Sequence, residues 1–276
     1  MPSAKIGGRD IHHEIEGRGD PLLLIAGFGC DRTIWSFVRP ALAERFRVIT
    51  FDNRGMGRSS GGDAPFSIRD LADDAAALLD AIGLDGASPT VHVAGHSMGG
   101  LIAQELALAR PRQVRSLMLL SCGTRIDERG RTIISSWGEL ARLVEPATAV
   151  RLAAPWIYTR AFFARPGALD GLIRSVVESP FPPTPEALLH QSRAVCACDI
   201  GDRAGAIGSP TLVLVGRDDL LSTLAQSEAL ARTIEGAELV VLDGTAHGLL
   251  VESPDAVSGA MLEFLARVAA GRSGAQ

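Results

Sequence analysis

Several features that mark particular protein classes are missing from this sequence. Its 276 residues contain no long basic run, and 27 Lys and Arg against 32 Asp and Glu give a net charge of −5. Binding of nucleic acid requires a basic stripe, so nucleic acid is not expected as a partner. The first ten residues lack the apolar segment of a secretory signal peptide, and no stretch is apolar enough to predict a membrane span.

Cysteine is also scarce, and the motifs of common cofactor sites are absent. The four cysteines are scattered along the chain at Cys30, Cys122, Cys196 and Cys198. Without an export signal they are expected to be reduced thiols in a cytoplasmic protein. Neither His12-His13 nor Cys196-x-Cys198 has companion residues at metal-ligand spacing, and no phosphate-binding or dinucleotide-binding glycine motif is present. We therefore expect no metal.

The sequence does contain short apolar runs that alternate with longer helical patterns. The runs are Leu22–Ala26, Val48–Phe51, Val91–Ala94, Val114–Leu120, Thr211–Val215 and Leu239–Leu242. Because apolarity is nearly continuous in each run, burial on both faces is expected, as in a parallel sheet covered by helices. The helical patterns span Ile34–Arg45, Ile68–Ile82, Met98–Ala109, Leu224–Ile234 and Pro254–Ala270. This alternation predicts an α/β fold with a mostly parallel, doubly wound sheet.

One region, residues 124–208, interrupts this alternation. It contains no run that resembles a buried strand, and it carries many of the large aromatic side chains. We interpret it as a helical cap inserted into a core formed by residues 1–123 and 209–276. Ligands of open α/β sheets bind at the carboxyl ends of the strands, so a cap is expected to lie there.

The strongest chemical signal is Gly95-His96-Ser97-Met98-Gly99, which follows one apolar run and precedes a helical pattern. A G-x-S-x-G sequence in that context predicts a tight strand-to-helix turn that presents the serine hydroxyl as a nucleophile. A serine nucleophile needs a base and an orienting acid. His247 lies in a loop just after Leu239–Leu242, and Asp218-Asp219 follows Thr211–Val215, so either aspartate fits. The chain order Ser, Asp, His is that of α/β-hydrolases.

A tetrahedral intermediate formed on Ser97 needs two preorganised hydrogen-bond donors. The first is expected to be the N–H of Met98, which follows the nucleophile. The second is expected from the loop Gly27–Cys30 after the first apolar run, with Phe28 as the donor. Glycines in that loop, Gly27 among them, let the backbone approach a substrate closely.

Taken together, the motifs resemble the α/β-hydrolase superfamily along nearly the whole chain. Beyond GHSMGG, they include Asp52-x-Arg54-Gly55-x-Gly57-x-Ser59, Gly216-x-x-Asp219 and His247-x4-Glu252-x-Pro254. The GFGCD loop is similar to that of the bacterial stress-signalling hydrolase and butenolide-receptor branch, and the rest is more similar to 3-oxoadipate enol-lactonases and small bacterial esterases. The resemblance selects Asp219 as the acid.

The sequence departs from the family pattern at two positions. Ala26 stands where His usually precedes the oxyanion loop, so we expect that loop to be braced differently, and Thr223 stands where a proline usually closes the acid turn. Ser97 also excludes the epoxide hydrolases and haloalkane dehalogenases, which need an aspartate nucleophile at that position.

These observations predict a cofactor-independent serine hydrolase that cleaves a small, mainly apolar carboxylic ester or lactone. Alternatives on the same fold are a C–C bond or thioester hydrolase, a cofactor-free oxygenase, or a ligand receptor or signalling protein with slow turnover. An apolar pocket is expected near the serine. Its expected lining includes several large aromatic side chains, namely Trp35, Trp137, Trp156, Phe162 and Phe163.

Overall fold

The computed structural model describes residues 2–85 and 90–273; residues 1, 86–89 and 274–276 of the expected core lie outside the described residues. One eight-stranded sheet runs through the molecule in the order β1-β2-β4-β3-β5-β6-β7-β8. The strands are β1 (Ser3–Ile6), β2 (Arg9–Glu16), β3 (Pro21–Ile25), β4 (Arg47–Phe51), β5 (Val91–His96), β6 (Val114–Leu120), β7 (Thr211–Gly216) and β8 (Glu238–Leu242). Strands β3 to β8 pair in parallel, whereas β2 pairs antiparallel with β1 and β4.

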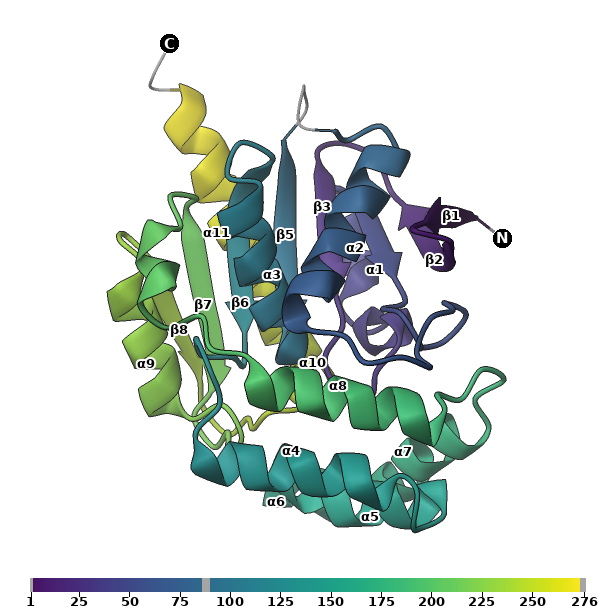
Figure 1. The fold of residues 1–276 in the computed structure, drawn as a ribbon. Coiled ribbons are helices and arrows are strands. Elements are labelled where there is room, and N and C mark those ends of the chain that lie inside the picture. The colour runs from purple at the N-terminus through teal and green to yellow at the C-terminus, as the bar shows by residue number, and fades with distance from the viewer. Residues whose placement is uncertain (1, 86–89, 274–276) are drawn as a thin grey trace.

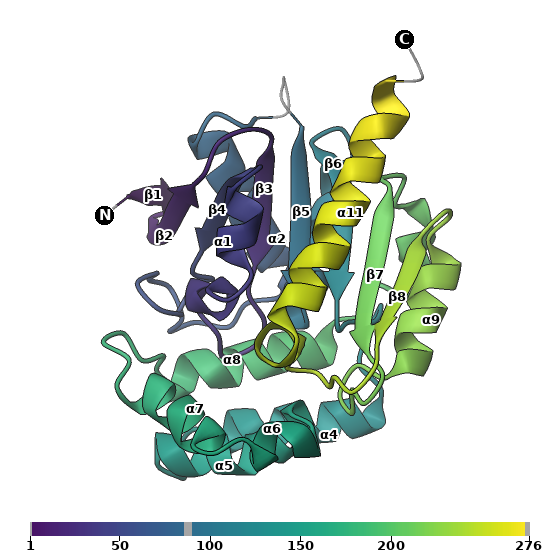
Figure 2. The same cartoon turned by 180° about the vertical axis from the view of Figure 1, so that it is seen from behind.

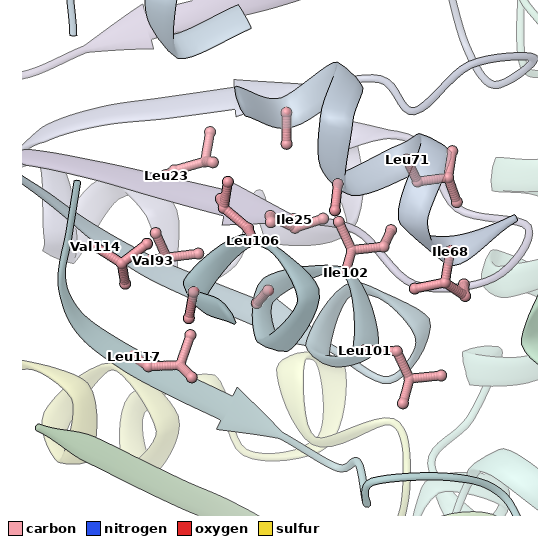
Figure 3. Close-up of a cluster of buried hydrophobic side chains, with 14 of the residues drawn as sticks. Leu23, Ile25, Ile68, Leu71, Val93, Leu101, Ile102, Leu106, Val114 and Leu117 are labelled. Carbon is pink, nitrogen blue, oxygen red and sulfur yellow. The ribbon is translucent and has the colours of Figure 1, made fainter. Parts of the chain in front are cut away.

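Helices cover both faces of this sheet, as Figures 1 and 2 show from opposite sides. The helices of the core are α1 (Arg39–Ala43), α2 (Ile68–Ala81), α3 (Met98–Ala109), α9 (Leu224–Thr233), α10 (Leu249–Glu252) and α11 (Pro254–Ser273). Helices α2, α3 and α9 pack on one face, and α1 and α11 pack on the other. Figure 3 shows side chains of β3, β5 and β6 meeting those of α2 and α3 in the first of these layers. The expected α/β fold with a mostly parallel, doubly wound sheet is therefore confirmed.

Local sequence explains where several of these elements begin. Ser67 and Asp70 form a reciprocal capping box at the start of α2, which satisfies two of the free N–H groups of its first turn. The expected helix Ile34–Arg45 is instead divided into a 3-10 turn, Arg32–Trp35, and the short helix α1. Pro40 explains the break, because a proline inside a continuous helix removes a hydrogen bond and clashes with the preceding turn. Strand β8 lies at the sheet edge and is only partly buried, so its apolar run does not have both faces covered.

The turn after β4 is fixed by buried charges. Asp52 is fully buried and accepts hydrogen bonds from the backbone N–H groups of Arg32 and Arg58. Arg54 is also buried, and its guanidinium donates to Asp74 of α2 at 2.6 Å. This turn therefore holds β4 and α2 together.

Residues 128–197 form five helices that lie across the carboxyl ends of the strands, at the bottom of Figure 1. They are α4 (Glu128–Leu140), α5 (Pro146–Ile157), α6 (Arg160–Ala164), α7 (Ala168–Val177) and α8 (Pro185–Ala197). We call α4–α8 the helical layer. Helix α8 lies next to the sheet, and α4 to α7 lie farther from it. Over the described ranges, no helix is long and apolar enough to cross a membrane.

Candidate active site

Ser97 sits at the turn between β5 and α3, in a backbone conformation that side chains rarely adopt. Its φ is 55° and its ψ is −118°. The flanking glycines make this turn possible, because a Cβ at Gly95 would lie 2.0 Å from the carbonyl oxygen of Gly99, and one at Gly99 would lie 2.2 Å from that of Ile25. The strained turn holds the hydroxyl at the start of α3, where free N–H groups and the helix dipole favour negative charge.

Three side chains from separate loops form a continuous chain of hydrogen bonds at this point. His247 Nε2 lies 2.9 Å from Ser97 Oγ, and His247 Nδ1 lies 2.9 Å from Asp219 Oδ2. The serine follows β5, the aspartate follows β7 and the histidine follows β8. All three loops leave the carboxyl ends of parallel strands, and those ends meet at one edge of the sheet.

The two adjacent aspartates after β7 have different surroundings. Asp219 is only 3% exposed, whereas Asp218 is exposed. Asp219 Oδ1 accepts the N–H groups of Leu221 and Ser222 at 2.9 and 2.8 Å. Burial alone would raise the pKa of Asp219, but the His247 imidazole and these two N–H groups hold that pKa below its usual range. Asp219 is therefore a carboxylate that faces the imidazole.

A second histidine, His96, lies beside His247. Its Nε2 donates a hydrogen bond to the backbone carbonyl of His247 at 2.9 Å, and the two rings lie 5.2 Å apart. Burial, together with repulsion from His247, lowers the pKa of His96 to about 4. His96 is therefore neutral at pH 7, with its proton on Nε2. The sequence placed His96 next to the nucleophile but gave no sign of this contact.

The loop after β3 passes close to the serine. A Cβ at Gly27 would lie 3.3 Å from Ser97 Cβ, so the absence of a side chain there permits the approach. The loop is braced from two directions, since Asn53 donates to the carbonyl of Ala26 at 3.1 Å and the N–H of Gly29 donates to Gln191 of α8 at 2.9 Å. Asn53 and Gln191 thus brace the loop in which Ala26 replaces the usual histidine. Nothing local in the sequence points to Gln191.

A cavity of about 20 Å³ adjoins Ser97 and His247. Phe28 and Met98 line it together with aliphatic side chains that belong to none of the sequence motifs. These include Leu101, Ile126, Ile134, Val195 and Leu221. Ile126 and Leu221 stand in loops shortly after β6 and β7, a position that could have identified them.

The aromatic residues expected in the pocket are found in several places. Trp35 is fully buried among core side chains beneath α1 and α11, so it does not reach the cavity and the expectation for it is corrected. Trp137 stacks behind Phe28 with ring centroids 6.3 Å apart. Phe162 is buried within the helical layer, whereas Trp156 and Phe163 are 36% and 39% exposed. Cavity contacts are thus made by aliphatic chains and Phe28, with Trp137 behind them.

Charge and metal-ligating side chains are sparse around the serine. Arg125 is the cationic side chain of the cavity lining, and its guanidinium pairs with Asp199 at 3.0 Å. Across residues 2–85 and 90–273, no group of three or more His, Cys, Asp or Glu side chains is arranged to hold a metal ion.

Comparison with known proteins gives consistent matches over nearly the whole chain. A family model described as "Alpha/beta hydrolase family" matches residues 22–260. A protein of Azorhizobium caulinodans named "Putative carbamate hydrolase RutD" is 34% identical over 97% of this chain and 99% of its own. The crystal structure of the enol-lactonase from Burkholderia xenovorans LB400 is 28% identical, with a TM-score of 0.87 over 96% of this chain and 100% of its own. A thermophilic esterase from Thermogutta terrifontis is 29% identical, with a TM-score of 0.86 over 97% and 99% of the two chains.

Proposed function

The chain belongs to the alpha/beta hydrolase family, and from that premise we propose that it is a serine hydrolase acting on a small carboxylic ester or lactone. Ser97 is the nucleophile, His247 the base and Asp219 the acid. The observation that carries the proposal is the continuous chain of hydrogen bonds from Ser97 Oγ through both nitrogens of His247 to Asp219. This is the arrangement by which a neutral hydroxyl is activated for attack on a carbonyl carbon.

The reaction proceeds in two halves. Ser97 Oγ attacks the carbonyl carbon while its proton passes to His247 Nε2, and Asp219 stabilises the imidazolium that forms. Collapse of the tetrahedral intermediate breaks the C–O bond, and His247 returns the proton to the leaving alcohol. Water then attacks the acyl-enzyme with His247 again as the base, and the carboxylic acid product is released. In a lactone the alcohol remains attached to the acyl group.

Two backbone N–H groups serve as the oxyanion hole. Met98 is the first residue of α3, so its N–H has no partner within the helix. In the loop after β3, the N–H of Gly29 is bonded to Gln191 and that of Cys30 to the carbonyl of Gly27. We therefore assign the second donor to the N–H of Phe28, which lies between Gly27 and those two bonded groups. Donors fixed in this way stabilise the developing negative charge without having to reorient.

The cavity favours a small, mainly apolar acyl group, because its lining is largely aliphatic. We assign the helical layer, within residues 124–208, as a cap domain that covers the serine. Carbamate is a second candidate substrate, because the relative at 34% identity carries a carbamate hydrolase name. A carbamate presents the same kind of carbonyl carbon to Ser97, so one machinery serves both candidates.

A fluorophosphonate probe and a substrate panel test this proposal. The wild type is expected to take up one probe per chain, and Ser97→Ala none. The panel compares p-nitrophenyl acetate, longer acyl esters, a set of lactones and a carbamate. Ser97→Ala is expected to lower turnover by several orders of magnitude, leaving about 10³–10⁴ over the uncatalysed rate. Near-normal turnover in a folded Ser97→Ala variant would refute the assignment, and the preferred panel member decides between ester, lactone and carbamate.

A further inference from the structure

Glu252 forms a bridge between two segments that are far apart in the sequence. It ends α10, five residues after His247, and both of its carboxylate oxygens are used. Oε2 accepts the N–H of Ala246, the residue before His247, at 2.9 Å. Oε1 accepts the N–H and the hydroxyl of Thr159, the N-cap residue of α6, at 2.9 and 2.6 Å. One carboxylate thus joins the His247 loop to the helical layer.

The same two segments touch at a second place. The N–H of Gly248 donates to the carbonyl of Ile157 at 2.8 Å. Gly248 also lies directly against the ring of Tyr158, since a Cβ there would be 2.3 Å from its Cε1. Tyr158 in turn stacks on Phe162, with ring centroids 4.1 Å apart. The residues on either side of His247 are therefore held by the junction between α5 and α6.

His247 has a separate set of contacts on the core side. Asp219 binds its Nδ1, and His96 binds its backbone carbonyl. The imidazole is thus positioned by two anchors, of which one belongs to the core and the other to the helical layer. Misplacement of a reacting group by about 1 Å can cost roughly a hundredfold in rate, so both anchors bear on proton transfer.

We propose that Glu252 is a positioning residue that couples the placement of the helical layer to the position of His247. The inference rests on the proposed function and extends it. The layer contributes Ile134 of α4 and Val195 of α8 to the lining of the cavity, so a substrate bulky enough to press on them shifts the layer. Through Glu252 and Thr159 that shift is transmitted to the loop that carries the base. Full activity therefore requires the layer to be seated, for a small acyl group as well as for a long one.

Thr159→Val tests this coupling with p-nitrophenyl acetate as the substrate. Valine keeps the shape of threonine and its backbone N–H, but it removes the hydroxyl that donates to Glu252. We expect kcat and the rate of fluorophosphonate labelling to fall about tenfold while KM stays nearly constant, because base placement and not binding is disturbed. Thr159→Ser retains the hydroxyl and is expected to restore both rates.

Thr184→Val is the matched control. Thr184 caps α8 of the same layer through its hydroxyl, as Thr159 caps α6, but it is exposed and its cap bond is to Ala187. Glu252→Gln provides a second test, because an amide accepts on one side only and presents an NH₂ group to the N–H donors on the other. We expect Glu252→Gln to lower kcat at least as much as Thr159→Val, and Thr184→Val to leave kcat unchanged.

Two results would overturn the coupling while leaving the proposed function intact. One is wild-type kcat in Thr159→Val, and the other is an equal loss in Thr159→Val and Thr184→Val. In either case Ser97→Ala would still lower turnover by several orders of magnitude and abolish labelling. Retained turnover in Ser97→Ala would overturn the proposed function and the coupling together. If Glu252→Gln does not fold, the threonine variants decide the question alone.

Discussion

Replacing Asp219 by asparagine gives a sharp test of the proposed triad, because the structure fixes how the new amide must point. Asp219 Oδ1 accepts two backbone N–H groups, from Leu221 and Ser222. In Asp219→Asn the amide oxygen has to remain at this position, since an NH₂ group there would face two donors. The NH₂ group is then placed at the former Oδ2, 2.9 Å from His247 Nδ1.

An NH₂ group at that position reverses the hydrogen bond to the imidazole. His247 must present an unprotonated Nδ1 to accept it, so its proton moves to Nε2. Nε2 then donates to Ser97 Oγ and can no longer accept the serine proton. Loss of the correct tautomer costs about 10⁴ in kcat, which corresponds to about 5.5 kcal/mol of transition-state stabilisation.

The assay is the turnover of p-nitrophenyl acetate by Asp219→Asn and Asp218→Asn, each confirmed as folded by thermal melting. Asp218 is exposed, and the carboxylate bonded to His247 is that of Asp219, so Asp218→Asn is expected to cost less than about tenfold. An Asp219→Asn enzyme within tenfold of the wild type would refute the tautomer argument. A larger loss in Asp218→Asn than in Asp219→Asn would transfer the role of the acid to Asp218.

Three further predictions concern stability. Trp35→Ala should lower the free energy of unfolding in urea by about 3–5 kcal/mol, because it empties a fully buried site; KM for a small ester should not change if Trp35 is outside the pocket. The pKa of His96 is about 4 in the folded protein, against 6.5 in the unfolded chain. Between these two pH values His96 is therefore protonated in the unfolded state and neutral in the folded state. Acidification from pH 6.5 to 4 should therefore remove about 3 kcal/mol of stability, a loss that His96→Gln should lack in pH-dependent urea unfolding. Arg54→Ala leaves Asp74 buried without its closest partner and should lower the free energy of unfolding by about 3 kcal/mol in the same assay. A loss below about 1 kcal/mol would show that the Arg54–Asp74 pair does not hold β4 and α2 together.

The amino-acid sequence by itself determined the elements of the fold and the position of the serine. Continuous apolar runs marked β3 to β7 within a residue or two, and the helical pattern Ile68–Ile82 marked α2. These features are local, since the apolar runs, the helical patterns and the glycines around Ser97 act within a few residues along the chain. The G-x-S-x-G turn could be recognised for the same reason, because its geometry depends on the glycines on both sides.

Only the tertiary structure decided the environment of that serine. The residues alone left open whether Asp218 or Asp219 is the acid that faces the histidine. In the structure Asp219 is the buried one, and its carboxylate is bonded to His247. The brace from Gln191 to Gly29 spans 162 residues, and the bridge from Thr159 to Glu252 spans 93.

Trp35 also shows that tertiary structure decides the environment of a side chain, because it was expected in the pocket and lies in the core. Its aromatic character fitted a pocket equally well as a core, and only the packing of α1 and α11 over it placed it in the core. Contacts of this kind join side chains that have no local pattern in common. They are set by how the strands order themselves in the sheet and by where the helical layer rests, which the sequence of a single segment does not encode.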